Sequence, residues 1–159
     1  MTIEFHAIGI IHSPFTHVDQ MPIQPTTGAS AAGFVEIFPE YREGLKDVDG
    51  FSHLFLLYHL HKVAQVKLTV IPFLDSEPRG VFSTRAPVRP NPIGISIVRL
   101  RGVKDNVLEI VDLDILDGTP LLDLKPYIPE FDAPAEVRTG WFENVRGNVK
   151  PTKSDDRFS

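Results

Sequence analysis

The sequence predicts an all-β protein, either a barrel or a sandwich. Seven to nine short runs of β-branched and aromatic residues are separated by turns rich in glycine, proline and aspartate. No segment has the apolar spacing of an amphipathic helix, and there is no internal repeat or low-complexity run. Short strands at regular spacing with such turns are typical of barrels and sandwiches.

The expected strands can be placed along the chain from their composition. They are Phe5–Ile11, Gly33–Phe38, Phe51–His61, Val66–Ile71, Val81–Thr84, Ile93–Val103, Val107–Leu116 and Leu121–Tyr127. The run at Phe51–His61 is the most apolar, which predicts a strand buried on both faces, with its odd-numbered side chains sharing one face. One helical turn is expected at Tyr41–Gly44, after Pro39.

Two expected strands show alternation that predicts which side is buried. Val98 and Leu100 alternate with arginines, as in a half-buried strand. The pattern of Val107–Leu116 changes phase along its length, because apolar residues occupy even positions first and odd positions later. A bulge or bend near Val111 would restore a single apolar face.

Length and composition indicate one soluble domain. The 159 residues are 42% hydrophobic and 23% charged, which is ordinary for a globular chain. We predict a barrel domain at residues 1–143 and a polar tail at 144–159. Cysteine is absent, which excludes disulfides and thiolate metal sites. The N-terminal apolar run is too short for a signal peptide and no stretch is long enough to span a bilayer, so we predict a cytoplasmic protein.

The charge is unevenly distributed. The net charge of −5 argues against wholesale, non-specific binding to nucleic acid. Yet residues 79–104 hold six basic residues and no acid, whereas residues 105–136 hold nine acids and one base, Lys125. The sequence leaves two interpretations open: a basic patch on an acidic protein, or neighbouring strands that neutralise each other.

The stretch Gly80–Ser96 is the strongest candidate for a site. Its three prolines fix the backbone and remove amide donors, so it is neither a helix interior nor a central strand. Side chains on so stiff a loop have little freedom left to lose. Arg85, Arg89 and Asn91 are therefore expected to be positioned for an anion or a planar polar group.

Three further segments are candidates. Residues 16–32 read as a long loop, and such loops within compact domains are usually functional or disordered. Residues 117–120 (Asp-Gly-Thr-Pro) form a turn whose backbone N–H groups and carboxylate are suited to bind an amine or hydroxyl-bearing ligand. Residues 123–129 again hold polar side chains on a proline-stiffened backbone.

Other chemistries are poorly supported by the sequence. His59 and His61 share a strand face, but no further ligand follows at useful spacing, so we predict no metal site. Neither a glycine-rich dinucleotide motif nor a phosphate-binding loop is present. The nucleophile motif Gly-x-Ser-x-Gly is absent as well.

Five sequence blocks, in order, carry a resemblance to a known family. They are IGIIHSPF at 8–15, GFSHL at 50–54, GVFSTR at 80–85, RPNPIG at 89–94, and DGTP at 117–120 with DLKPY at 123–127. On these blocks the chain resembles the TsaA-like, or TrmO, family, and the match covers roughly residues 3–143.

The resemblance implies a small β-barrel that binds S-adenosylmethionine, dimerises, and methylates the exocyclic nitrogen of threonylcarbamoyladenosine next to the anticodon of tRNA. It also implies the residues that contact the cofactor. They are Gln24, Pro25, Thr26 and Thr27 of the long loop, His61 and Lys62 after the central strand, Arg85, Ile95 through its backbone, and Asp117, Gly118, Thr119 and Pro120 of the turn.

The chemistry of these residues agrees with the resemblance. Arg85 suits a carboxylate or an adenine edge, and Asp117 suits an amine or ribose hydroxyls. The acceptor nitrogen must lose a proton, and the sequence offers Asp117, Asp114 or Tyr127 without choosing between them. Basic and polar side chains are expected to face tRNA: Arg89, Asn91 and Lys125.

Two other functions stay open. One is methylation of another RNA or a small molecule with the same fold, and the other is binding of S-adenosylmethionine or a nucleotide without catalysis. Turnover on tRNA distinguishes the tRNA methyltransferase from both of these alternatives.

Overall fold

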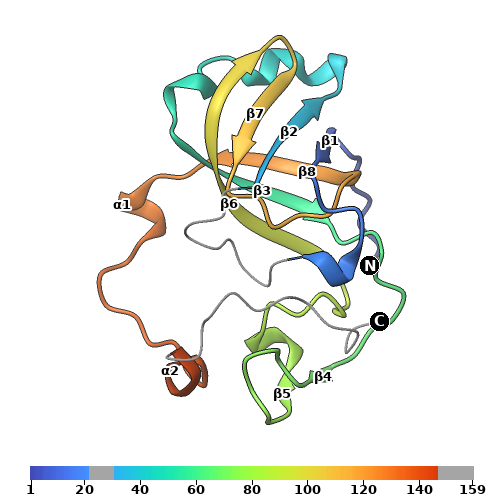
Figure 1. The fold of residues 1–159 in the computed structure, drawn as a ribbon, viewed down its shortest axis with the longest axis vertical. Coiled ribbons are helices and arrows are strands. Elements are labelled where there is room, and N and C mark those ends of the chain that lie inside the picture. The colour runs from blue at the N-terminus through green and yellow to red at the C-terminus, as the bar shows by residue number, and fades with distance from the viewer. Residues whose placement is uncertain (22–30, 147–159) are drawn as a thin grey trace.

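A computed structural model describes residues 1–21 and 31–146, and its main body is a closed antiparallel barrel (Figure 1). The strand order around the barrel is β1-β2-β7-β6-β3-β8. The strands are β1 (Gly9–His12), β2 (Ala32–Ile37), β3 (His53–His59), β6 (Ile93–Lys104), β7 (Val107–Val111) and β8 (Thr119–Pro126). The all-β fold predicted from the sequence is confirmed, and the barrel is the correct one of the two architectures.

The barrel interior is filled by alternate side chains from every strand, as the twofold periodicity of strands requires. Strand β3 contributes Leu54, Leu56 and Tyr58 to the core, and β6 contributes Ser96 and Val98. The outward side chains of β3 are only half-buried or exposed. The prediction that this strand is buried on both faces is therefore wrong, because the barrel core buries only its inward side chains.

The predicted phase change near Val111 is confirmed. Strand β7 ends at Val111, and Asp112 then takes a left-handed backbone conformation with φ 67°. Leu108 lies inside the barrel before this bend and Leu113 after it. The bend thus moves the inward positions from even to odd numbers while the chain keeps one apolar side.

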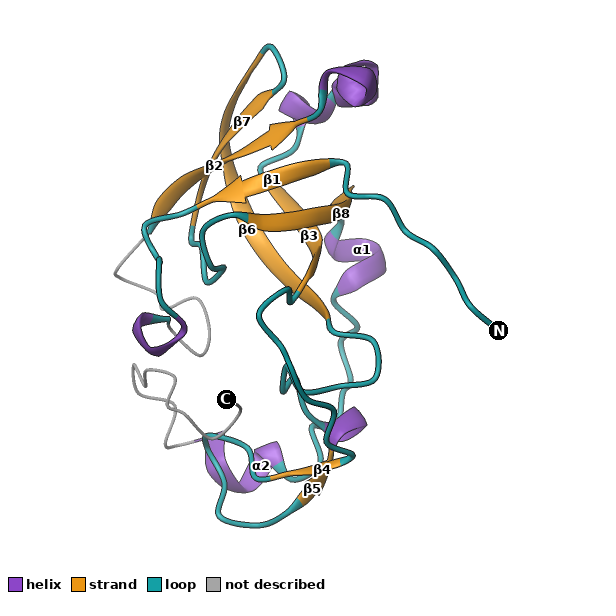
Figure 2. Ribbon diagram, turned by 90° about the vertical axis from the view of Figure 1, so that its right-hand side faces the viewer, coloured by secondary structure: helices purple, strands orange, loops and turns teal. Residues whose placement is uncertain are grey.

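A smaller body lies beside the barrel, around the two-stranded sheet of β4 (Thr69–Val70) and β5 (Arg79–Gly80) (Figure 2). The predicted strand at 66–71 is thus only two residues long. The predicted strand at 81–84 is wrong, because Val81–Ser83 is the 3₁₀ helix η4. The hydroxyls of Ser83 and Thr84 donate to carbonyls three residues earlier, which stabilises this turn in competition with strand pairing.

Short helices complete the described chain. They are η1 (Val18–Gln20), η2 (Pro39–Leu45), η3 (Val48–Gly50), α1 (Pro129–Asp132) and α2 (Phe142–Val145). The turn expected after Pro39 is thus confirmed as η2, whereas α1 and α2 were not predicted. The first expected strand, at 5–11, is shorter and later than predicted, as β1.

The C-terminal part of the described chain reaches the smaller body (Figure 1). Trp141 Nε1 donates a 2.8 Å hydrogen bond to the Ser83 carbonyl, and the Arg79 guanidinium lies 5.7 Å from the Trp141 ring centre. Arg79 also pairs with Asp75 at 2.7 Å. These contacts attach α2 to β5, whereas residues 147–159, most of the proposed tail, lie outside the described residues.

Candidate functional site

Three segments that are distant in sequence meet at one end of the barrel. The end of β3 pairs with the start of β6, with Tyr58 opposite Gly94 and His59 opposite Ile93. The other edge of β3 pairs with the start of β8, where Tyr58 lies opposite Leu121. The end of β3, the block that begins at residue 89 and the block that begins at residue 117 are therefore neighbours in space.

The predicted cofactor residues after β3 lie at this end of the barrel. The backbone N–H of His61 donates to the His59 carbonyl at 2.8 Å, and the His61 side chain is half-buried beside exposed Lys62. Burial lowers the pKa of the His61 imidazole, and the positive charge of Lys62 lowers it further. His61 is thus set to be a neutral hydrogen-bonding group near pH 7.

The proline loop is held by one of its own arginines. Nη1 of Arg89 donates to the carbonyls of Thr84 at 3.1 Å and Ala86 at 3.2 Å. Val88 is fully buried in the smaller body, whereas Arg85 is exposed. Arg89 therefore stiffens the loop, and Arg85 is the arginine that this loop presents to solvent.

The loop continues into the candidate end of β6. The backbone N–H of Ile93 donates to the carbonyl of exposed Asn91 at 2.8 Å, and that of Leu60 to the carbonyl of Pro92 at 2.8 Å. Ile95 follows two residues later, on the outer face of β6 opposite Leu57. These bonds join the proline loop to the segment that carries His61.

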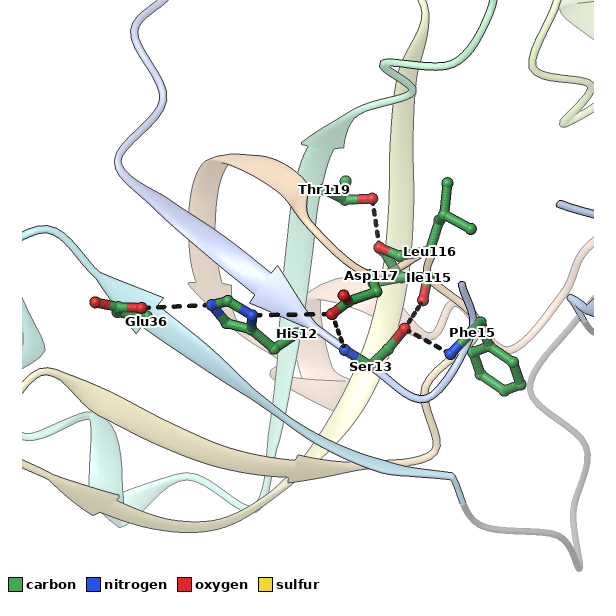
Figure 3. A network of polar contacts seen from close by, with 8 residues as sticks. All are labelled: His12, Ser13, Phe15, Glu36, Ile115, Leu116, Asp117 and Thr119. Atoms are coloured by element: carbon green, nitrogen blue, oxygen red, sulfur yellow. Dashed lines mark hydrogen bonds and ion pairs between the residues drawn. The ribbon is translucent and has the colours of Figure 1, made fainter. Parts of the chain in front are cut away.

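The turn at 117–120 is attached to the end of β1 (Figure 3). Asp117 Oδ1 accepts a 2.9 Å hydrogen bond from the Ser13 backbone N–H, and Ser13 Oγ donates to the Ile115 carbonyl at 2.5 Å. The backbone N–H groups of Asp117 and Gly118 donate to carbonyls of Phe15 and Ile11. The suggestion that these two N–H groups bind a ligand is therefore wrong, because the carbonyls of Phe15 and Ile11 already accept from them.

The same turn leaves its carboxylate accessible. The Asp117 side chain is exposed, whereas Thr119 is buried and its hydroxyl donates to the Leu116 carbonyl at 2.6 Å. Gly118 adopts φ 76°, a conformation that side-chain-bearing residues rarely take. The contribution of this turn to a ligand would thus come from the Asp117 carboxylate rather than from its first amides.

His12 is a neighbour of Asp117 that sequence reasoning missed. Its Nδ1 lies 3.8 Å from Asp117 Oδ1 and its Nε2 lies 3.4 Å from Glu36 Oε2 (Figure 3). The His12 ring also stacks on Phe34, with ring centres 4.5 Å apart. The block at 8–15 contains His12, so the resemblance marked the segment but not the role of the side chain.

A second missed feature is a series of hydrogen-bonded polar side chains that joins buried Tyr58 and Ser96 to half-buried Asp114. The Tyr58 hydroxyl lies 2.9 Å from Ser96 Oγ, which donates a 2.6 Å hydrogen bond to Asp114 Oδ1. Burial raises the pKa of the Asp114 carboxyl and of the Tyr58 hydroxyl, and the Arg85 charge lowers both. Parity within the strands could have indicated this series, because Tyr58 and Ser96 are polar residues at inward-facing positions.

Two residues predicted for the site lie away from this end of the barrel. Lys125 is opposite Phe55 and forms an ion pair with Asp123 at 2.8 Å. Tyr127 packs edge-on against Phe55 with ring centres 5.5 Å apart, and its N–H donates to the His53 carbonyl. Both are near the start of β3, so the described structure brings neither to the end of the barrel that holds Asp114.

Ion pairs neutralise part of the basic stretch at 79–104. Arg79 pairs with Asp75 and Arg99 pairs with Asp112 at 3.4 Å across the β6–β7 edge. The interpretation that neighbouring strands neutralise each other thus holds for Arg99. Arg85 and Arg101 remain exposed.

Comparison with known proteins decides the family. The sequence-family model that describes the tRNA-methyltransferase O N-terminal domain matches residues 10–133. The chain belongs to this family. The resemblance read from five sequence blocks is thereby confirmed.

Relatives of the family share most of this chain. A probable S-adenosyl-L-methionine-binding protein of Pyrococcus abyssi is 52% identical over 99% of this chain and 86% of its own length. The tRNA (adenine(37)-N6)-methyltransferase of Escherichia coli K12 is 39% identical over 80% of this chain. A crystal structure of TrmO from Pseudomonas aeruginosa has a TM-score of 0.75 at 38% identity over 89% of this chain.

The chain spans only part of several family members. It covers 59% of the Escherichia coli protein and 63% of the solved Pseudomonas aeruginosa chain. The cofactor and the enzyme class expected from the sequence agree with the names that these relatives carry.

The side chains at the barrel end fit the cofactor expected for the tRNA-methyltransferase O family. A guanidinium at Arg85 matches a carboxylate, and the carboxylates at Asp114 and Asp117 match an amine, a sulfonium charge or ribose hydroxyls. Apolar side chains at the start of β6 suit an adenine ring. The four candidates at 24–27 lie outside the described residues.

Two features are absent from the part of the chain that the structure describes. No three or more acidic or histidine side chains are grouped to bind a metal ion among residues 1–21 and 31–146. In the same ranges, no helix is both long enough and apolar enough to cross a lipid bilayer.

Proposed function

We propose that this chain is an S-adenosylmethionine-dependent methyltransferase that acts on the exocyclic nitrogen of adenosine 37 in tRNA, with threonylcarbamoyladenosine as its substrate. The observation that supports this most strongly is the meeting of the His61, Arg85 and Asp117 segments at one barrel end. The names of the Escherichia coli and human relatives give the same reaction class.

The proposed division of labour follows from the exposure of the side chains. Arg85 and Asp117 are exposed and bind the charged ends of the cofactor, and Ile95 contacts it through its backbone. The bound cofactor supplies a methyl group on a positively charged sulfur. The chain itself orients the acceptor nitrogen, excludes water and accepts a proton, so positioning provides most of the rate enhancement.

The proposed tRNA contacts are exposed polar and basic side chains of the proline loop and β6. Asn91 is exposed in the proline loop next to the site, and exposed Arg101 lies on β6. Arg89 is half-buried and also holds the loop, so a substitution that reverses the charge of Arg89 would disturb the loop as well as RNA binding. Lys125 would contact RNA only at the other end of β3. A tRNA substrate also implies a cytoplasmic location.

We further propose a homodimer that uses the outer face of β3 and β6. Ile93, Ile95 and Ile97 are 39–46% exposed, and the last two lie opposite Leu57 and Phe55. Adjacent apolar side chains on one exposed sheet face are typical of protein interfaces. Because Ile95 belongs to the proposed cofactor site, a second copy on this face would also border the cofactor.

Sedimentation equilibrium tests the dimer. The wild type is expected to sediment as a dimer and Ile97→Lys as a monomer. Val137 is 63% exposed on the segment between the two short helices, so Val137→Lys is the matched control and should stay dimeric. A wild-type monomer that still binds the cofactor would refute the dimer.

A different function is favoured by one observation. Four archaeal relatives carry names that describe S-adenosylmethionine binding without an activity. The deciding experiment incubates the chain with labelled S-adenosylmethionine and tRNA that either carries or lacks threonylcarbamoyladenosine. Label in the modified tRNA alone supports the proposal, label in both supports a broader substrate, and cofactor binding without transfer to either supports a binding protein.

A further inference from the structure

The Tyr58, Ser96 and Asp114 side chains come from three separate segments and form one hydrogen-bonded chain. Tyr58 is on β3, Ser96 is on β6, and Asp114 follows the bend after β7. Ser96 is only 5% exposed and Tyr58 7% exposed. Since a buried polar group is costly without partners, the two bonds of 2.9 and 2.6 Å explain why these hydroxyls are tolerated inside the barrel.

The hydrogen bonds that link Tyr58, Ser96 and Asp114 have a defined donor-to-acceptor direction when Asp114 is ionised. A carboxylate only accepts hydrogen bonds, so Ser96 must donate to Asp114, and its oxygen then accepts from Tyr58. When Asp114 gains a proton, it can donate to Ser96, and Ser96 can donate to Tyr58. Two hydroxyl rotations therefore accommodate proton uptake without moving any heavy atom.

Asp114 also lies at the boundary between the core and the proposed site. The groups whose charge or titration acts on it are Tyr58 on β3 and Arg85 on the proline loop. Burial raises the pKa of the Asp114 carboxyl, which brings it closer to the range useful for a base near neutral pH. Burial raises the pKa of Tyr58 as well, so its hydroxyl stays neutral.

The two other candidates, Asp117 and Tyr127, are less suitable as proton acceptors. Oδ1 of Asp117 is occupied by the Ser13 N–H and faces His12. Tyr127 contacts Phe55 on the outer face of β3, away from Ser96. Asp114 is the candidate that combines burial, a neighbouring cation and a second hydrogen-bonded group.

We propose that Asp114 accepts the proton in methyl transfer and that Ser96 and Tyr58 are the positioning residues that hold its carboxylate and adjust to its protonation. This inference rests on the proposed function. The acceptor nitrogen forms its bond to the methyl carbon as the S–CH₃ bond breaks, with that electron pair left on sulfur. The N–H proton passes to Asp114 and then to water.

The first test follows the Asp114 carboxyl by ¹³C NMR in the cofactor-free protein, with the signal assigned by its loss in Asp114→Asn. We expect it to titrate above the ordinary aspartate range. Ser96→Ala removes the bond that favours the carboxylate, so the midpoint should move to higher pH. Tyr58→Phe should shift it less in the same direction, and Ser52→Ala, a matched control at an exposed serine, should leave it unchanged.

The second test measures turnover on tRNA against pH. We expect Asp114→Asn to lower kcat by about 10²–10⁴-fold, and Ser96→Ala to move the acid limb of the profile to higher pH. The dissociation constant of the cofactor should stay within about twofold for Ser96→Ala, because the lost group is a positioning one.

Three results distinguish failure of the proton-acceptor role, of the positioning role and of the proposed function. Undiminished kcat in Asp114→Asn, or a loss confined to cofactor affinity, would overturn Asp114 as proton acceptor while leaving the methyltransferase intact. An Asp114 signal that ignores Ser96→Ala would overturn the positioning role. No turnover by the wild type would overturn the proposed function itself, and the proton-acceptor role with it, whereas the carboxyl titration would still decide whether Ser96 and Tyr58 position Asp114.

Discussion

Gly94 packs against the Tyr58 ring, which belongs both to the barrel core and to the hydrogen-bonded series Tyr58–Ser96–Asp114. A Cβ at this position would lie within 3.0 Å of three atoms of the Tyr58 ring, whereas carbon atoms in contact prefer about 3.5–4.0 Å. The ring cannot move freely, because it is buried and its hydroxyl is bonded to Ser96. Gly94→Ala must therefore shift either the ring or the strand.

The cost of Gly94→Ala can be assigned from these contacts. Overpacking of a filled core costs about 1–3 kcal/mol, and loss of the Tyr58–Ser96 hydrogen bond adds about 1 kcal/mol. The lower chain entropy of the unfolded alanine variant offsets about 0.4–1 kcal/mol. We expect a net loss of about 1–3.6 kcal/mol, which for a chain of this size lowers Tm by about 2–14 °C.

Urea denaturation at pH 7 measures this difference. Gly102→Ala is the matched control, because Gly102 lies on the same strand and a Cβ there meets nothing within 4 Å. The cost of Gly94→Ala should also shrink in a Tyr58→Leu background, since the two residues share one contact. Equal stability of Gly94→Ala and Gly102→Ala would refute the packing argument.

Three other variants test separate features. Because the folded protein raises the pKa of Asp114, it binds this proton more tightly than the unfolded chain; Asp114→Asn should therefore increase the free energy of unfolding at pH 8, and urea titrations should show the gain vanish as pH falls below about 3.9. Gly118→Ala places a side chain at φ 76° and should cost about 1–2 kcal/mol in the same assay, whereas Gly44→Ala, in open space, should cost nothing of this kind. Trp141→Phe removes the hydrogen bond to Ser83, so limited proteolysis should cut the segment at 133–140 faster; an unchanged rate would contradict the attachment of α2.

Alternation in the sequence predicted the barrel strands well, because it records which side chains face the core. The positions of Val98 and Leu108 inside the barrel followed from it, and so did the bend after Val111. The strand expected at Val81 failed for a local reason: the hydroxyls of Ser83 and Thr84 stabilise a turn that composition alone does not reveal.

The site was predictable only where a motif marked it. Arg85 and Asp117 stand out through their glycine and proline neighbours. Tyr58 and Ser96 resemble ordinary strand residues, and their partnership with Asp114 depends on the register of β3 against β6. Sequence reasoning also placed Tyr127 with the candidate acceptors, whereas strand β8 carries it to the other end of β3.

Cofactor binding tests the central claim most directly. Calorimetric titration of the folded chain with S-adenosylmethionine should show saturable binding, and Arg85→Ala should weaken it at least about tenfold, as expected for loss of a charge-assisted contact. Arg101→Ala removes another exposed arginine, at the far part of β6, and should bind like the wild type. Absence of binding by the folded wild type, or equal affinity of Arg85→Ala and the wild type, would contradict the site at this end of the barrel.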